Sequence, residues 1–335
     1  MSTRLVVASS PHIHSPLDTR AIMAAVLTSL APAGAAGLWF FGLSALWVIA
    51  TCIAACVLSE WLWQRLRGQT STVRDLSAAV TGLLLAYNLP PTIPLWMAAV
   101  GSVFAIIIVK QFYGGLGCNI VNPALAARAM MLISWPVAMT AWTLNGVSGA
   151  TPLAVMKMGA AATSSATVMG PAAVLPSFWN LLTGNMAGCI GETSALLLLV
   201  GGLYLIWAEI ISWRIPVVYI LTAVILASLF GHGGGSFPHY ELLSGGLMLG
   251  AFFMATDYTT SPMTARGQYI FAAGCGLLTA LIRTWGGYPE GVSFSILIMN
   301  VAVPLIDRYT IPRILGEPKK AWPWSHETDK EGAKQ

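Results

Sequence analysis

The sequence predicts an all-α integral membrane protein of about ten transmembrane helices. Hydrophobic residues make up 56% of its 335 residues and charged residues only 9%, whereas soluble domains carry about a quarter charged residues. The apolar runs are unbroken rather than alternating, which favours helices over the strands of a barrel. The positions of Lys and Arg then favour a topology with both termini in the cytoplasm.

Ten apolar segments define the expected helices. They run over residues 21–37, 39–62, 75–89, 94–111, 121–136, 193–212, 216–231, 242–256, 268–283 and 292–308. The predicted organisation is a cytoplasmic segment 1–20, a first five-helix half 21–136, a periplasmic loop 137–192, a second five-helix half 193–308 and a cytoplasmic tail 309–335.

The basic residues fall on one side of this arrangement. Fourteen of the 17 Lys and Arg residues lie at cytoplasmic positions, only Lys157 and Arg283 lie on the outer side, and Arg128 falls inside the fifth segment. Moving one span would break the pattern, so the loop 137–192 is expected to face the periplasm of a bacterium.

A weak internal repeat accompanies the ten segments. KQFYGGLGCN (110–119) resembles IRTWGGYPEG (282–291), and LLLAYNLPP (83–91) is comparable to FFMATDYTTSP (252–262). Since each half has an odd number of helices, the second copy is upside down relative to the first. The pattern predicts two inverted five-helix repeats with helices interrupted at the Gly and Pro positions.

Several classes of function are disfavoured. The net charge of +4 is too small to indicate a nucleic-acid surface, and the five cysteines form no CxxC pair. No dinucleotide-binding fingerprint is present, so the sequence gives no sign that this chain itself binds a nicotinamide cofactor.

The stretch NGVSGATPLA (145–154) lies in the longest segment that the sequence predicts to be exposed to water. Pro152 suits the first turn of a helix, with Thr151 as its N-cap. A helix N-terminus also favours a phosphate, because free N–H groups and the helix dipole point there. Two interpretations follow: an ordinary helix cap, or an attachment point for a phosphate ester.

Further motifs carry a resemblance that favours attachment. SGAT (148–151), SSPHIHSP (9–16), YGGLGCNIVNPALAAR (113–128), ATDYTTSP (255–262) and YPEGVSFSILIMNVAVPLID (288–307) resemble motifs of one family, spread over nearly the whole chain. That family comprises the integral flavoprotein subunits of the Rnf and sodium-pumping quinone reductase complexes (NqrB/RnfD). Asn145 stands where the family motif usually has Asp.

The resemblance implies covalent FMN, joined through its phosphate to Thr151 by a flavin transferase that reads the motif Ser148, Gly149 and Ala150. It also implies a fold like that of urea and ammonium channels, and a second, non-covalent riboflavin nearer the cytoplasm. The short N-terminal segment favours the RnfD branch, whose complexes couple ferredoxin and NAD+ to Na+ or H+ movement across the inner membrane. Implied partners are flavin-bearing and iron–sulfur subunits and membrane lipid.

Three alternatives remain open at this stage. The chain resembles the NqrB branch, the B subunit of a sodium-pumping NADH:quinone reductase, in the same motifs. A solute channel or transporter of the same fold would have no flavin and a continuous pore. A passive scaffold subunit would leave electron flow unchanged when Thr151 is lost.

Four further polar residues are candidates for flavin or ion contacts. Asp257 could bind a cation, cap a helix or hydrogen-bond a flavin, because a buried acid in a membrane is costly and often functional. Asn119 and Asn122 could satisfy the backbone of a broken helix. Arg128 needs a partner or a phosphate. No metal site is expected.

Other charged residues have plainer expectations. Glu60 lies near the end of a segment, where its side chain is expected to reach water. Arg283 and Glu290 flank the sequence WGGYP on the outer side. They are expected to pair with each other or to help hold a flavin.

Overall fold

The structure is a computed structural model that describes residues 18–144, 147–149, 151–162, 176–192, 194–230, 238–288 and 290–312. Most of the expected N-terminal segment 1–20 and of the tail 309–335 lies outside these residues, as does Ala150. The described chain is helical except for one short hairpin, in which strand β1 (Thr143–Leu144) pairs antiparallel with β2 (Val147–Ser148).

Long apolar helices confirm that the chain is a membrane protein. Four helices are long and apolar enough to cross a membrane: α1 (Thr19–Phe41), α2 (Leu43–Leu66), α13 (Ala265–Trp285) and α14 (Val292–Thr310). Large apolar side chains cover their outside and that of the neighbouring helices, for example Trp39, Val137 and Trp207, each more than four-fifths exposed. Such a surface fits lipid rather than water.

Shorter elements fill the rest of the bundle. In the first half they are η1 (Val73–Asp75), α3 (Ser77–Tyr87), α4 (Leu95–Val103), the π-helical η2 (Phe104–Gln111) and α5 (Pro123–Ser134). Next come α6 (Pro136–Met139), α7 (Pro152–Ala162), α8 (Phe178–Thr183) and η3 (Ile190–Glu192). The second half adds α9 (Ala195–Trp207), α10 (Arg214–Phe230), α11 (Pro238–Leu243), α12 (Leu247–Leu249) and the π-helical η4 (Gly250–Met254).

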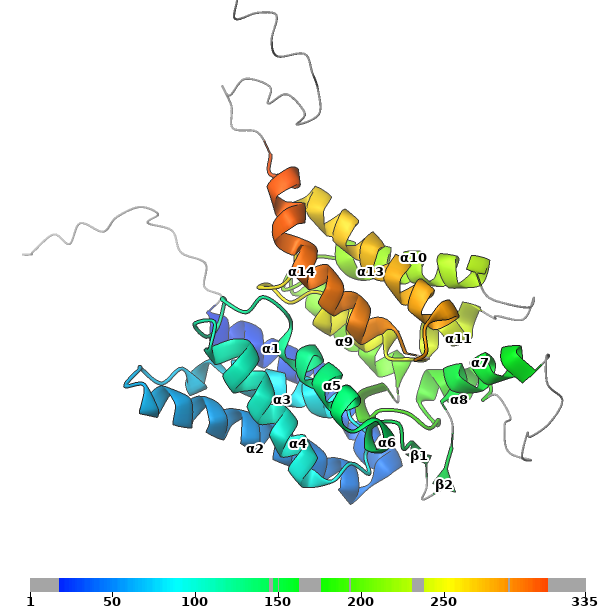
Figure 1. Cartoon of the computed structure of the whole chain (residues 1–335), viewed down its shortest axis with the longest axis horizontal. Coiled ribbons are helices and arrows are strands. Elements are labelled where there is room, and N and C mark those ends of the chain that lie inside the picture. Colours follow the sequence, from blue (N-terminus) through cyan, green and yellow to red (C-terminus); the bar gives the residue numbers. More distant parts are fainter. Residues whose placement is uncertain are drawn as a thin grey trace, which may run out of the picture.

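Every one of the ten expected segments overlaps a helix. The fourth segment is α4 continued by η2, and the eighth is divided among α11, α12 and η4. In Figure 1, α1 to α5 gather in one group and α9 to α14 in another. The inverted repeat and the channel-like fold stay predictions.

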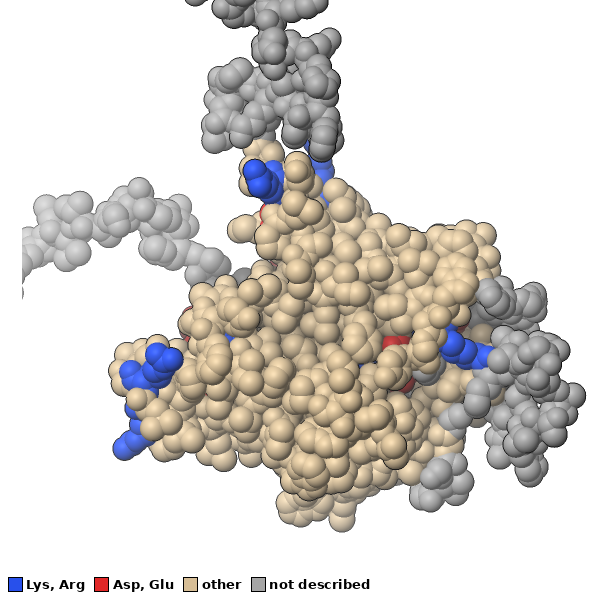
Figure 2. Space-filling view, viewed as in Figure 1, with Lys and Arg blue, Asp and Glu red and all other residues tan. Residues whose placement is uncertain are grey.

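Much of the described part of the segment 137–192 lies at one end of the bundle. Helices α6, α7 and α8 and the hairpin β1–β2 lie together there (Figure 1), and we call this the motif end. In the view of Figure 2, Lys and Arg lie at the edges of the molecule, with a broad uncharged surface between them. That distribution is the one that a membrane imposes.

Polar side chains at the ends of helices lie in the interior of the bundle. Asn122 caps α5, with its Oδ1 accepting from Ala124 N at 3.0 Å, and its Nδ2 donates to the carbonyl of Met254 at 3.3 Å. Asn88, just after α3, donates to the sulfur of the same Met254 at 3.6 Å. Ends of α3, α5 and η4 therefore meet inside the bundle, as expected for interrupted helices.

The expectation for Glu60 is wrong. Its carboxylate is buried and accepts from Lys110 Nζ at 3.0 and 3.1 Å and from Gln111 Nε2 at 2.9 Å. Lys110 also donates to Ser77 Oγ at 2.8 Å. Because η2 packs over this turn of α2, the side chain has no path to water and needs an internal cation instead.

Candidate functional site

Thr151 lies directly before α7 at the motif end. Its Oγ1 accepts from Ala154 N at 3.3 Å and its carbonyl accepts from Val155 N at 3.0 Å, so it acts as the predicted N-cap. The expected exposure of this residue is wrong, because Thr151 is only 1% exposed. Pro152 and Leu153 are buried with it, and the Leu153 side chain packs against Gly245 in the turn between α11 and α12.

The described residues before Thr151 lie in the hairpin and at the surface. Ser148 pairs with Thr143 in the hairpin, and Gly149 is exposed and donates its N–H to the carbonyl of Trp142 at 3.0 Å. The motif thus runs from an exposed glycine to a buried threonine within three positions.

Three of the candidate residues line one cavity. Asn119, Asn122 and Asp257 lie around a cavity of about 770 Å³, which we call the Asn–Asp cavity. Its apolar walls include Phe252 and Phe253 of η4. No pattern in the sequence indicated that α1, α3, η2 and α9 also contribute to it.

The polar groups of this cavity already have local partners. Asp257 Oδ2 accepts from the hydroxyls of Thr259 and Thr260 at 3.0 and 3.2 Å, so this acid holds the turn after η4. Asn119 Nδ2 donates to the carbonyl of Val121 at 3.2 Å. The amides are thus fixed in place by the backbone, and they line the cavity with hydrogen-bonding edges in an apolar surround.

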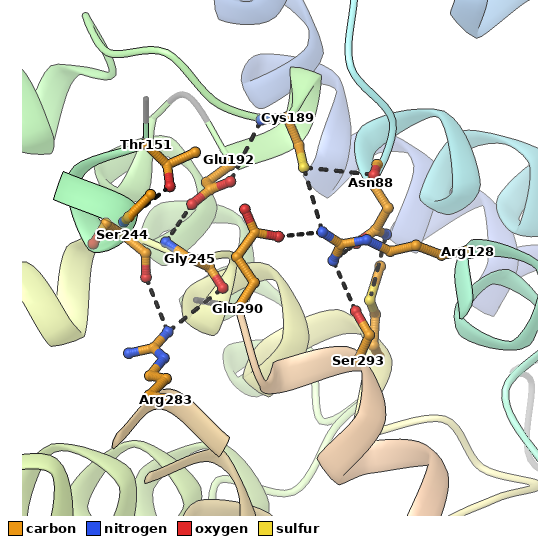
Figure 3. Close-up of polar contacts among 12 residues, drawn as sticks. Asn88, Arg128, Thr151, Cys189, Glu192, Ser244, Gly245, Arg283, Glu290 and Ser293 are labelled. Atoms are coloured by element: carbon orange, nitrogen blue, oxygen red, sulfur yellow. Dashed lines mark hydrogen bonds and ion pairs between the residues drawn. The ribbon is translucent and has the colours of Figure 1, made fainter. Parts of the chain in front are cut away.

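Arg128, on α5, lies in a different place and finds protein partners (Figure 3). Its guanidinium donates to Ser293 Oγ at 2.7 Å and to Asn88 Oδ1 at 3.1 Å, and it forms an ion pair with Glu290. It also contacts Cys189 Sγ at 3.7 Å. The partner that Arg128 was expected to need is therefore Glu290, which comes from the second half of the chain.

A second cavity opens beside this ion pair. It has about 460 Å³, and we call it the Arg128 cavity. Its lining combines charged and hydroxyl groups with aromatic rings: Arg128, Glu290, Ser293, Trp142, Tyr288 and Phe294. Because the carbonyl of Trp142 holds Gly149, this cavity adjoins the segment that leads to Thr151.

The expected pair between Arg283 and Glu290 is wrong. Arg283 Nη1 donates to Glu241 Oε2 at 2.7 Å and to the carbonyl of Glu241 at 2.6 Å, and its Nη2 donates to the carbonyl of Ser244 at 3.1 Å. Helix α11 brings Glu241 to Arg283, while Glu290, past the turn after α13, lies nearer α5. Arg283 thus stabilises the α11–α12 turn.

Lys157, on α7, links the motif end to the turn that follows α13. Its amine donates to the carbonyls of Gly286 and, at 3.4 Å, of Tyr288. Partial burial lowers the pKa of Lys157. This cation therefore anchors α7 to the segment that leads into α14.

Sequence reasoning missed Glu192 and Cys189. Glu192 is buried at the end of η3, and its carboxylate accepts the N–H of Cys189 at 3.4 Å and the N–H of Gly245. In the sequence, Glu192 lies just before an apolar segment. An acid at such a position can face water as readily as the interior, so the sequence did not indicate its burial.

These features define a class of protein: a helical membrane protein with interrupted helices, internal polar cavities and a threonine motif at one end of its bundle. Comparison with known proteins then gives the family. The model of the NQR2, RnfD, RnfE family matches residues 6–316, and the chain belongs to this family.

Curated relatives agree with that assignment over nearly their whole length. The chain is 52% identical over 321 residues to the D subunit of the Na(+)-translocating ferredoxin:NAD(+) oxidoreductase complex of Acetobacterium woodii, covering 94% of this chain and 96% of the relative. It is 47% identical over 315 residues to the D subunit of the proton-translocating complex of Clostridium ljungdahlii, covering 91% and 94%. It is 39% identical over 354 residues to the D subunit of an ion-translocating oxidoreductase complex of Escherichia coli, covering 93% and 99%.

Proposed function

We propose that this chain is the flavin-carrying D subunit of an ion-translocating ferredoxin:NAD+ oxidoreductase complex. The names of its relatives support this activity, and the motif ending at Thr151 supports covalent FMN. In this proposal the complex lies in the bacterial inner membrane, both termini are cytoplasmic and the motif end is periplasmic. Ferredoxin and NAD+ bind to other subunits, which carry iron–sulfur clusters and further flavins.

The residues at Thr151 fit a phosphate ester in one respect and resist it in another. The residue caps α7, a helix of 11 residues whose N-terminus favours an anion. However, the hydroxyl is buried and already accepts a hydrogen bond. Attachment therefore requires Thr151 to move out of this position. In this proposal the backbone at the exposed Gly149 allows that movement and is the surface that a flavin transferase contacts.

When bound, FMN supplies the one-electron chemistry, and the protein supplies position and polarity. The Arg128 cavity adjoins the motif and offers aromatic walls with a guanidinium, which suits a planar, electron-accepting ring.

The Asn–Asp cavity supports the second part of the proposal, a non-covalent riboflavin. The fixed amides of Asn119 and Asn122 and the Asp257 turn can meet the polar edge of a flavin ring, and the phenylalanines can meet its face.

In-gel flavin fluorescence tests the covalent attachment. The chain is co-expressed with a flavin transferase, denatured and compared with Thr151→Ala and with Thr183→Ala, an exposed threonine on α8 at the same end of the bundle. Fluorescence should survive denaturation in the wild type and in Thr183→Ala and should vanish in Thr151→Ala. A dark wild-type band beside an active transferase would favour the solute channel instead.

Extractable flavin tests the second site separately. Asn119→Leu and Asp257→Asn should lower the riboflavin released by denaturation without changing the in-gel fluorescence at Thr151. Equal riboflavin in the variants and in the wild type would remove the Asn–Asp cavity from the proposal and leave the covalent site standing.

A further inference from the structure

Two acidic side chains from distant segments face each other beside Arg128. Glu192 ends η3 and Glu290 precedes α14, and their carboxylates point toward one another (Figure 3). One oxygen of each acid and the sulfur of Cys189 lie within 4.8 Å of one another. Two acids at this separation raise the question of how their charges are compensated.

The described residues supply one positive charge for two carboxylates. Arg128 pairs with Glu290 and directs its other donors to Asn88 and Ser293. Glu192 accepts the backbone N–H groups of Cys189 and Gly245, and the Cys189 thiol also lies against it. Arg283, the next cation near Gly245, is committed to Glu241. With both acids ionised the cluster carries +1 − 2 = −1, and a buried uncompensated charge is costly.

A second observation shows where the compensation belongs. Glu290 Oε1 is a buried acceptor without a hydrogen-bond partner in the described part of the chain. Its other oxygen, Oε2, holds Arg128. In Figure 3 the free oxygen points toward the Glu192 carboxylate. A buried acceptor needs a donor, and an ionised Glu192 has none to give.

We infer that Glu192 and Glu290 share one exchangeable proton, carried on Glu192 and donated to Glu290 Oε1. A proton from water binds one carboxylate oxygen of Glu192. No electron moves, and the cluster becomes neutral. A divalent metal fits less well, because the Arg128 guanidinium already touches both Glu290 and Cys189. The pair is a proton-binding site at the motif end, and it does not depend on bound flavin.

The surroundings place the exchange in the physiological range. Burial, with the neighbouring Glu290 charge, raises the pKa of Glu192 to about 7. Burial also raises the pKa of the Cys189 thiol, so this group stays neutral. The charged groups that face Glu192 are therefore Glu290 from the segment before α14 and Arg128 from α5, and these lie on opposite halves of the chain.

Infrared spectroscopy of the full chain tests the inference directly. The carboxylic C=O band is followed between pH 5 and 9 in H2O and D2O, in the wild type and in a Thr151→Ala chain that lacks the attachment residue. Both should show one D2O-sensitive band that disappears with a midpoint near pH 7. The band should be missing in Glu192→Gln and unchanged in Glu209→Gln, an exposed acid.

A further variant keeps the result interpretable if Glu192→Gln folds poorly. In Glu290→Gln the neighbouring charge is gone and Arg128 has lost its acid, so the Glu192 band should titrate at lower pH than in the wild type. Absence of a titrating band in the wild type would overturn the inference, as would a band that persists in Glu192→Gln. A midpoint that falls when NaCl replaces choline chloride would also overturn it, since the site would then hold Na+.

Discussion

Removing the Arg128 guanidinium should be among the most damaging single changes in the protein. Arg128→Met leaves Glu290 without its cation and takes donors from Asn88 Oδ1 and Ser293 Oγ, which it reaches at 3.1 and 2.7 Å. The side chains of the pair are 9% and 11% exposed. Loss of one partner of a buried pair costs about 3–5 kcal/mol, and this range sets the expected loss.

The double variant Arg128→Met/Glu290→Gln isolates the charge from the packing. It removes both charges, so the remaining cost should be about 1–2 kcal/mol for the lost hydrogen bonds. With Glu290→Gln as the second single variant, the coupling energy between the two positions should be at least about 2 kcal/mol. Arg308→Gln, at an exposed position on α14, is the matched control and should change stability by less than about 0.5 kcal/mol.

The free energy of unfolding of these five proteins, the wild type included, is measured in mixed detergent micelles at pH 8. Equal stability of the single and double variants would refute the reasoning, because Glu290 would then have no need of Arg128.

Three further predictions follow from other parts of the structure. Gly82→Ala should destabilise the chain by about 1–3 kcal/mol in a thermal unfolding scan, because an added Cβ meets Cys52 O and Ile53 Cα at 2.8 Å. Gly287→Ala is the control and should be tolerated in the same scan, because the space around Gly287 is open. An impermeant maleimide should label the exposed Cys118 in inverted membrane vesicles but not in spheroplasts, and labelling in spheroplasts would reverse the proposed topology. Because the pKa of Glu192 is raised to about 7 in the folded chain, the folded chain binds more protons than the unfolded chain between about pH 4.5 and 7. Wild-type stability should therefore fall relative to Glu192→Gln as the pH rises through this window. Melting curves recorded at several pH values check this trend.

Local features of the fold could be predicted from the sequence because their causes are local. Continuous apolar runs indicated the helices of the ten segments, and Thr before Pro marked the cap of α7. The break in the eighth segment lies at Gly positions of LLSGGLMLGAFFM (242–254), where the sequence allowed an interruption but did not give its place. Gly245 and Gly246, both with positive φ, divide it into separate short helices.

Burial of the polar residues could not be predicted in the same way, because it depends on what covers them. Glu60 lies near a helix end, as a water-facing residue would, but Lys110, 50 residues later, covers it. Thr151 lies in a polar-looking loop, but the turn at Gly245 covers the start of α7. In both cases the segment itself carries no trace of the neighbour that removes the water.

In a membrane protein, the balance of buried charges indicates which residues form ion pairs better than their separation in the sequence does. Arg128 and Glu290 are 162 positions apart, yet each is the partner the other requires. A chain with few charges cannot leave one of them buried without compensation, so every interior Arg or Lys must be matched to an acid. Among the described residues, Lys110, Arg128 and Arg283 are matched by Glu60, Glu290 and Glu241. Glu192 is left without a cation in this matching, and a proton is the smallest group that can balance it.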